Sequence, residues 1–260
     1  MILLAIGDVV GQPGMEALRN TLPQLKKEYN VDLTVVNGEN AAETGTGLSR
    51  GEVKHLFSFG ADVITTGNHS FRRPGWEDLF EETEALLRPQ NYMNGIPGRG
   101  VYIYDKGSYK AAFINLIGQA FMNVPSRSPY DVLDEILNRA DADIYIVDFH
   151  AESTSEKICL ARAFDGKISV LFGTHTHVQT ADESVYPGGT GYITDLGMTG
   201  PEDSIIGVVP SLAIRKQRYG VPVRFSVQKS TASVCGAVFD IDERSGKCQS
   251  VRRFRCPARY

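Results

Sequence analysis

Short apolar runs of three to six residues recur along the first two thirds of the chain, separated by longer stretches with helical patterns. The runs span residues 2–6, 33–36, 63–65, 111–116, 144–147 and 170–172. Several of them are apolar throughout, which is typical of strands in a sheet that is covered on both faces. This pattern excludes an all-helical fold and requires helices that pack on the sheet.

The stretches between these runs supply such helices. Residues 13–29 place Leu18, Leu22 and Leu25 on one side at helical spacing. Ser128 and Pro129, followed by Asp131, are typical of a helix start, with proline at the first position and a carboxylate available for capping. The alternation predicts an α/β fold, a layered sandwich of β-sheets flanked by helices. A length of 260 residues suits a single domain that spans residues 1–260.

The C-terminal part of the chain has a different pattern. Residues 224–227, 234–241 and 250–254 alternate in the way that antiparallel strands do, and a turn sequence occupies residues 244–246. The glycine-rich segment 187–200 is interrupted by apolar residues, which favours a loop that lines a site over a flexible tether. We therefore expect an antiparallel strand region at the C-terminus.

Polar residues that can bind metals follow the predicted strands directly. They are Asp8 after the first run, Glu39 and Asn40 after the second, Asn68 and His69 after the third, His150 after the run at 144–147, and His175 and His177 after the run at 170–172. In an open α/β sheet, residues just beyond the carboxyl ends of parallel strands share one edge. The sequence therefore predicts one polar site, built from five loops.

The residue types at this site suit transition metals. Imidazole and carboxylate ligands favour Fe, Mn or Zn, and the absence of a cysteine argues against a thiolate site. Seven candidate ligands exceed what one ion needs, whereas two ions that share a carboxylate would use them all. The remaining histidine, His55, falls inside a helical pattern and is expected to lie outside the site.

Each of these residues has a simpler explanation when taken alone. A single Asp8 after a strand is usually a helix cap or a turn residue. A single His150 is more often a buried structural histidine than a ligand. The pair His175 and His177 is stronger, because strand alternation directs both rings to the same side. The coincidence of five such loops favours the metal site.

A serine-hydrolase motif has to be weighed against the metal site. Residues 47–51 read G-L-S-R-G and match the nucleophile pattern G-x-S-x-G. That motif must lie on a sharp turn between a strand and a helix, but the residues before it are polar and glycine-rich. Ser49 with Glu52 three positions later is better explained as a capping box for the next helix.

Charge restricts the partners of this protein. The formal net charge of −4 argues against a broad nucleic-acid-binding face, which needs a surplus of Lys and Arg. A small phosphorylated substrate fits better, because bound metal ions reverse the local electrostatic field.

The apolar runs indicate the compartment in which we expect this protein. The apolar run at 2–6 has no basic region before it, and no run approaches the length of a membrane span. We expect a cytoplasmic protein with no membrane association.

The four cysteines are spaced unlike a metal finger and are expected to be free thiols. In an alternative, Cys235 faces Cys248 or Cys256 across a hairpin.

The order of these motifs resembles that of the calcineurin-like metallophosphoesterases, and within them the bacterial YmdB-like cyclic-nucleotide phosphodiesterases. The matching runs are IGDVVG at 6–11, NGENAA at 37–42, TGNH at 66–69, DFHAE at 148–152, GTHTH at 173–177 and TDLGMTG at 194–200. The resemblance covers residues 1 to roughly 210. The chain departs from the wider superfamily at Val10, where a histidine is usual, and at Glu39, where aspartate is usual. The YmdB-like branch is similar in both respects.

The resemblance implies roles for individual residues. Asp8, Asn40 and His177 would hold one ion, Asn68, His150 and His175 the other, with Glu39 bridging the two. His69 would be the general acid that protonates the leaving oxygen. The resemblance also implies iron or manganese as the metal, a homo-oligomer, and hydrolysis of 2′,3′-cyclic or 3′,5′-cyclic nucleotides by a hydroxide that the metal pair generates.

Two other functions remain compatible with the sequence. The first is a general phosphomonoesterase or nucleotidase, which would use the same metal chemistry. The second is a non-catalytic metal-containing sensor that binds a nucleotide. His69 disfavours the sensor, because binding alone needs no proton donor.

Overall fold

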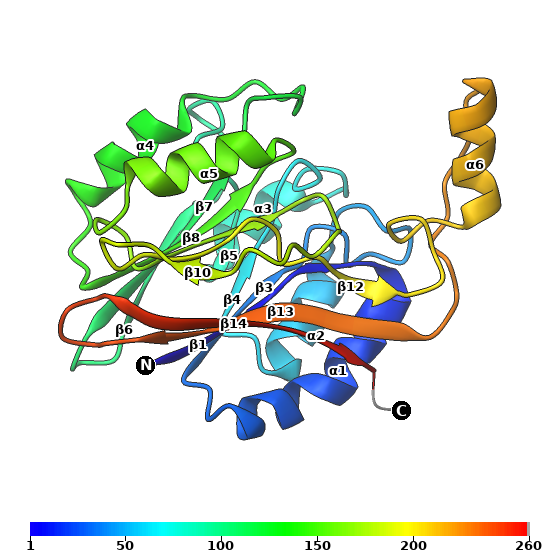
Figure 1. The fold of residues 1–260 in the computed structure, drawn as a ribbon. Coiled ribbons are helices and arrows are strands. Elements are labelled where there is room, and N and C mark those ends of the chain that lie inside the picture. The colour runs from blue at the N-terminus through cyan, green and yellow to red at the C-terminus, as the bar shows by residue number, and fades with distance from the viewer. Residues whose placement is uncertain (259–260) are drawn as a thin grey trace.

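The computed structural model describes residues 1–258 and contains two mixed β-sheets packed face to face, with helices on both outer faces (Figure 1). The first sheet has the order β2-β12-β13-β1-β3-β4-β5, with β14 paired to β13. Its strands are β1 (Ile2–Ile6), β2 (Asp8–Val9), β3 (Leu33–Asn37), β4 (Val63–Thr65), β5 (Leu86–Leu87), β12 (Met198–Pro201), β13 (Ala232–Ile241) and β14 (Cys248–Pro257).

The second sheet has the order β10-β11-β9-β8-β7-β6. Its strands are β6 (Val101–Asp105), β7 (Lys110–Ile117), β8 (Ile144–His150), β9 (Val170–Thr174), β10 (Ser184–Val185) and β11 (Gly191–Ile193). The neighbours β1, β3, β4 and β5 run parallel, as do β7, β8, β9 and β11. All six predicted strands of the first two thirds are confirmed.

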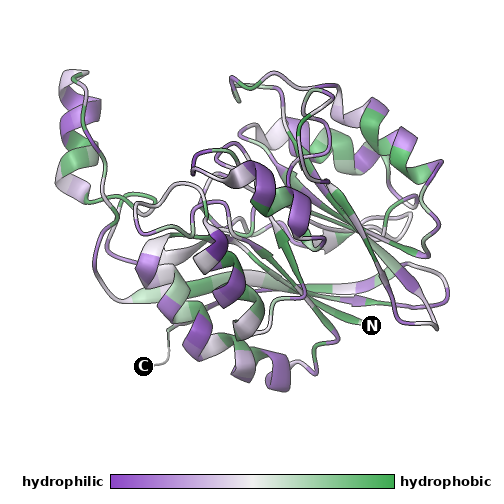
Figure 2. Cartoon of the chain, turned by 180° about the vertical axis from the view of Figure 1, so that it is seen from behind, coloured by the Kyte–Doolittle hydropathy of each residue, from purple (hydrophilic) through white to green (hydrophobic). Residues whose placement is uncertain are grey.

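Three apolar clusters explain why these strands are nearly free of polar residues. Leu3 and Ala5 of β1 face the second sheet, whereas Leu4 and Ile6 face the helices on the other side. The helices on that side are α1 (Gly11–Glu28), α2 (Arg50–Phe59) and α3 (Trp76–Glu82), and α4 (Pro129–Leu137) and α5 (Thr154–Ala163) cover the second sheet. A strand buried on both faces is mostly apolar along its whole length. Figure 2 shows hydrophobic strands between helices of mixed hydropathy.

The helix starts agree with the local sequence. Ser49 caps α2 in a capping box with Glu52, as predicted. Residues 41–49 contain no strand, so the strand-turn-helix geometry of a nucleophile is absent. Ser128 caps α4, where its hydroxyl oxygen accepts from the backbone N–H of Asp131. The side chain of Asp131 is therefore not the cap. In the part of the chain that the structure describes, no helix is both long and apolar enough to cross a membrane.

Two expectations for the C-terminal third are wrong. Residues 224–227 form no strand and make only an isolated bridge, between Val208 and Val227. The segment 187–200 contains all of β11 and the first part of β12, because its apolar residues complete both sheets. The hairpin of β13 and β14 is confirmed, but β13 lies beside β1 in the interior of the first sheet.

The remaining helix, α6 (Pro210–Tyr219), stands apart from the layers (Figure 1). Only Ala213 of this helix is buried. The four cysteines are free thiols, as expected. Cys256 lies opposite Val234 in the hairpin and Cys235 opposite Arg255, so the two thiols are offset by one residue and alternate faces.

Candidate dinuclear metal site

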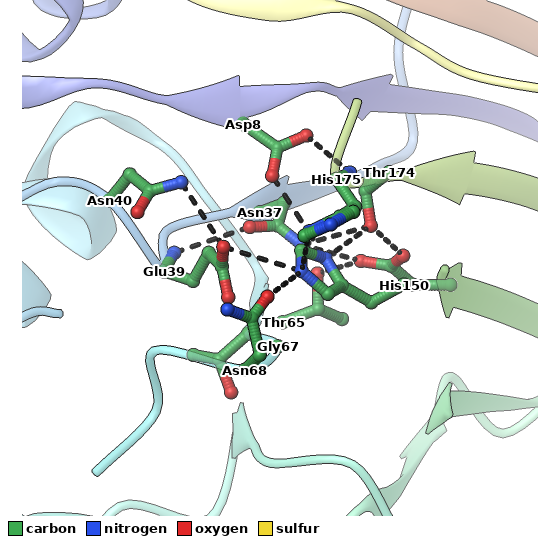
Figure 3. A network of polar contacts seen from close by, with 12 residues as sticks. Asp8, Asn37, Glu39, Asn40, Thr65, Gly67, Asn68, His150, Thr174 and His175 are labelled. Carbon is green, nitrogen blue, oxygen red and sulfur yellow. Dashed lines mark hydrogen bonds and ion pairs between the residues drawn. The ribbon is translucent and has the colours of Figure 1, made fainter. Parts of the chain in front are cut away.

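The eight predicted site residues meet where the carboxyl ends of strands from both sheets converge. Asp8, Glu39, Asn40, Asn68 and His69 follow strands of the first sheet, and His150, His175 and His177 belong to or follow strands of the second. Figure 3 shows Asp8, Glu39 and Asn68 of the first set around His150 and His175 of the second. The chain therefore brings together residues far apart in the sequence, as in the contact across 167 positions from the His175 N–H to Asp8 Oδ2.

The loop after β4 approaches this cluster so closely that it needs a glycine. A Cβ atom at Gly67 would lie 2.2 Å from His150 Cδ2 and 2.4 Å from Glu39 Oε2. Both side chains are buried and fixed by other contacts, so neither can move aside. The glycine in the T-G-N-H run is thus explained by the space that the predicted ligands occupy.

Asp8, Asn40 and His177 form one group. The amide nitrogen of Asn40 lies 3.1 Å from His177 Nε2, and His177 Nε2 lies 3.9 Å from Asp8 Oδ1. Asn68, His150 and His175 form a second group. His150 Nε2 lies 3.0 Å from Asn68 Oδ1 and 3.1 Å from His175 Nδ1.

Glu39 lies between the two groups. Its Oε1 accepts from the Asn40 amide at 3.1 Å and lies 3.3 Å from His150 Nε2. Its Oε2 accepts from the backbone N–H of His69 at 3.1 Å. Only 1% of Glu39 is exposed. One buried carboxylate therefore contacts both groups of candidate ligands.

Each of the three candidate ligand histidines is oriented through its other ring nitrogen. His150 Nδ1 contacts Thr174 Oγ1 at 2.9 Å, His175 Nε2 lies 3.1 Å from Glu152 Oε2, and His177 Nδ1 lies 3.0 Å from the carbonyl oxygen of Ile206. Such partners fix the tautomer and the ring orientation of a metal-binding histidine. The nitrogen left over in each ring faces the centre of the cluster.

A buried carboxylate behind the site joins the two sheets. Asp148 of β8 accepts hydrogen bonds from Asn37 Nδ2 and Thr65 Oγ1 of the first sheet and from Thr174 Oγ1 of its own sheet. Burial raises the pKa of Asp148 to about 6, although His150 and these hydrogen bonds oppose the shift. Because Thr174 also contacts His150, this network ties a candidate ligand to the interface between the sheets.

A buried ion pair supports the turn that carries His175 and His177. Lys157 and Asp195 are both fully buried, and Lys157 Nζ lies 2.8 Å from Asp195 Oδ2. The ammonium also donates to the carbonyl oxygen of Thr174, and Asp195 accepts from the backbone N–H of Thr176. The two histidines have φ angles of 101° and 65°, a left-handed backbone that surrounding contacts must maintain.

Burial and neighbouring charges shift the pKa values of the acidic and histidine side chains in this cluster. Burial disfavours the charged forms of Glu39 and His150, but the attraction between them outweighs it. The pKa of Glu39 is lowered well below its usual value, and the pKa of His150 is raised to about 9 with help from Asp8. Burial and the neighbouring His150 lower the pKa of His175 to about 3. Because metal ligands must be deprotonated, a metal ion that binds here would release protons.

The donor set fits a metal site. The Oδ1 atom of Asp8 is fully buried and has no hydrogen-bond partner among the described residues. A buried carboxylate oxygen without a partner is costly, and a cation would satisfy it. Glu39, His150 and His175 bring ligand atoms within 4.8 Å of one another. The chemistry of the full set, oxygen and imidazole nitrogen without thiolate, suits Fe, Mn or Zn.

His69 lies beside the candidate ligands and His55 does not, as the sequence suggested. His69 Nδ1 lies 2.7 Å from Asn40 Oδ1, and its side chain is 26% exposed beside the cluster. His55 is exposed on α2, where its ring stacks on Phe59. His69 is thus next to the candidate ligands, and His55 is outside the site.

Sequence reasoning missed the residues that orient the ligands. Glu152 and Asp195 lay in motifs that were recognised, but neither was given a role. Asp148 and Thr174 also lay in recognised motifs and were likewise given no role. Lys157 carried no signal, because a lysine in an amphipathic helix is normally exposed.

Solved structures establish the class of this fold. A putative 5′-nucleotidase from Staphylococcus aureus superposes with a TM-score of 0.63 at 18% identity, over 99% of this chain and 54% of that chain, a likeness of fold alone. A crystal structure described as a novel phosphatase from Mycoplasma pneumoniae superposes with a TM-score of 0.94 at 36% identity, over 99% of this chain and 93% of that one. The fold is metallophosphoesterase-like, as predicted.

The chain belongs to the family of YmdB-like proteins, whose model matches residues 4–254. It is 42% identical, over 255 residues, to the Bacillus subtilis (strain 168) protein named 2′,3′-cyclic-nucleotide 2′-phosphodiesterase, with 97% of this chain and 96% of that protein covered. The match extends well past residue 210, where the resemblance in the motifs ended. The predicted class of hydrolase, a phosphodiesterase or phosphatase, is confirmed.

Proposed function

We propose that this protein is a phosphodiesterase that hydrolyses 2′,3′-cyclic nucleotides with a pair of transition-metal ions, iron or manganese. The observation that carries the proposal is the position of Glu39, which contacts both groups of candidate ligands with one carboxylate. The B. subtilis relative named for this substrate aligns over nearly the whole chain.

The ligands would divide between two ions according to the contacts among their side chains. Asp8, Asn40 and His177 would hold one ion, and Asn68, His150 and His175 the other, with Glu39 shared. When bound, the metal pair would supply Lewis-acid activation of water and of the phosphoryl group. Asn40 would contribute its amide oxygen, because an amide nitrogen is no metal ligand.

His69 lies beside the candidate ligands, with Nδ1 2.7 Å from Asn40 Oδ1. To act as the general acid it must be the imidazolium, because a neutral imidazole that gave up its one N–H proton would become an imidazolate. Transfer of one proton from the imidazolium to the departing ribose oxygen would leave His69 as the neutral imidazole. By analogy with the relative's name, that oxygen would be the 2′-oxygen, and the product a nucleoside 3′-phosphate.

A substrate panel tests the proposal directly. Protein loaded with Mn or Fe would be assayed on 2′,3′-cyclic nucleotides, 3′,5′-cyclic nucleotides and phosphomonoesters, with products separated by chromatography. We expect the highest kcat/KM for the 2′,3′-cyclic compounds. Preference for phosphomonoesters would support the rival phosphatase function, to which the M. pneumoniae structure's description corresponds.

Metal content gives a second, independent test. We expect close to two transition-metal ions per chain after purification without chelator, because the seven candidate ligands exceed what one ion needs. Elemental analysis measures this number. Protein that stays metal-free after incubation with Mn or Fe would contradict the site assignment and the function together.

A further inference from the structure

A hollow of about 440 Å³ opens over the candidate metal site. Its lining includes the polar residues Glu39, His69 and His177 of the candidate site. It also includes residues 206–208 and 225–227, which are apolar except for Ser226 and are called the apolar wall below. Sites for small molecules commonly combine an apolar wall with a few convergent polar groups. The volume falls in the range of such sites, roughly 300–1,000 Å³.

The apolar wall is fixed to the metal site by hydrogen bonds. The carbonyl oxygen of Ile206 lies 3.0 Å from Nδ1 of His177, and Ile206 has a φ of 46°, unusual for a β-branched residue. The backbone N–H of Gln228 donates to the carbonyl oxygen of Gly207, and that of Val209 to the carbonyl oxygen of Ser226. The two wall segments therefore hold each other and a candidate ligand, so the wall is formed before any substrate binds.

Two large apolar side chains in this wall remain exposed. Ile206 is 52% exposed and Phe225 is 41% exposed. Among the described residues that line the hollow, Phe225 has the only aromatic ring apart from the histidines. The ammonium of Lys216, from α6, lies 4.9 Å from the centre of this ring. These contacts hold the ring at the rim of the hollow.

We propose that Phe225, with Ile206 beside it, is the platform on which the nucleobase of the substrate stacks. This inference rests on the proposed function, in which the cyclic phosphate lies over Glu39 and His69. A nucleotide has a polar phosphate at one end and a flat, largely apolar base at the other. The hollow likewise has polar residues at the candidate metal site and apolar residues in its wall. Stacking on a phenyl ring recognises any base by its face and does not read its edge, so purines bind more tightly than pyrimidines with little further selectivity.

The test compares a nucleotide with a substrate that lacks the base. Adenosine 2′,3′-cyclic phosphate and methyl riboside 2′,3′-cyclic phosphate would be assayed with the wild type and with Phe225→Ala, both metal-loaded. Loss of one stacking contact should reduce the preference for the nucleotide by about 5- to 150-fold, mainly through KM. Phe225→Trp should preserve the preference. Phe121→Ala, which removes a phenyl ring that is 83% exposed and outside this hollow, should leave it unchanged.

A binding measurement separates the platform from catalysis. Calorimetric titration with adenosine 3′-phosphate should show weaker binding to Phe225→Ala by a similar factor, and near wild-type binding to Phe225→Trp. An unchanged nucleotide preference, or an equal loss of activity on both cyclic phosphates, overturns the platform. If the wild type hydrolyses neither cyclic phosphate, the proposed function fails, and the titration alone then decides whether Phe225 binds a base.

Discussion

The two sheets contribute different chemistry to the site. Strand β2 and the loops after β3 and β4 of the first sheet supply the carboxylates and amides, namely Asp8, Glu39, Asn40 and Asn68. The second sheet supplies the three candidate ligand histidines from the end of β8 and the turn after β9. Each proposed ion takes ligands from both sheets, so neither half can form the site alone.

This division explains the network behind the site. Asp148 of the second sheet accepts from Asn37 and Thr65 of the first, which fixes how far one sheet can slide along the other. Apolar packing between sheets is weakly directional, whereas hydrogen bonds to one carboxylate are specific. The polar network therefore sets the alignment that the ligands need.

The strongest test of the division is Glu39→Ala, because this residue is proposed to serve both ions. We expect loss of most metal affinity and a fall in activity larger than the ~10²–10⁴-fold expected for a single proton donor. Elemental analysis and turnover would be measured side by side. Glu82→Ala, which removes a surface glutamate paired with Arg50, is the control. Full metal content in Glu39→Ala would disprove the bridge.

His69 is the one histidine that the first sheet contributes, and it should behave unlike the three of the second sheet. His69→Ala should keep both ions and lose ~10²–10⁴-fold in turnover. The loss should shrink for a nitrophenyl ester, whose leaving group needs little protonation. His55→Ala is the matched control on the surface of α2. Loss of metal in His69→Ala, with equal losses on good and poor leaving groups, would mean that His69 only orders the loop of Asn68.

Thr174 tests how the second sheet holds its ligands. Thr174→Val keeps the shape of the side chain but removes the hydroxyl between Asp148 and His150. We expect metal affinity to fall by ~10–100-fold, chiefly at the ion assigned to His150. Competition with a chelator measures this. Thr231→Val, an exposed position, should show no change, and an equal effect of both variants would refute the role of Thr174.

Metal binding should also stabilise the packing of the two sheets. A ligand at 100 times its Kd adds about 2.7 kcal/mol to the free energy of unfolding when it binds only the folded state. Urea unfolding with and without Mn would show this increment in the wild type. The same increment in Glu39→Ala would place the stabilising ion elsewhere.

The smallest effect is expected for Ser49→Ala. The side chain of Ser49 is engaged in the capping box of α2, so its loss should cost at most ~1 kcal/mol of stability. Turnover should stay close to that of the wild type. Loss of turnover here, together with retained activity in Glu39→Ala, would revive the serine-hydrolase interpretation.

Prediction from sequence succeeded where the signal was local. The buried strands are short apolar runs, and α2 begins at a capping box that can be read from Ser49 and Glu52. The segments around β11 and residues 224–227 were misassigned because short runs of mixed residues become strands or loops according to their neighbours. Residues 224–227 extend along residues 206–209 and complete no sheet.

The sequence by itself determined which side chains could bind metals, because carboxylate, amide and imidazole groups at strand ends are a property of the chain. It also determined that these groups follow short apolar strands. Only the tertiary structure decided that the strands belong to two sheets whose ends meet, which atom of Asp8 lacks a partner, and that Lys157 is buried behind the site. These features depend on the distance and alignment between two sheets, which arise from the packing of residues far apart in the sequence.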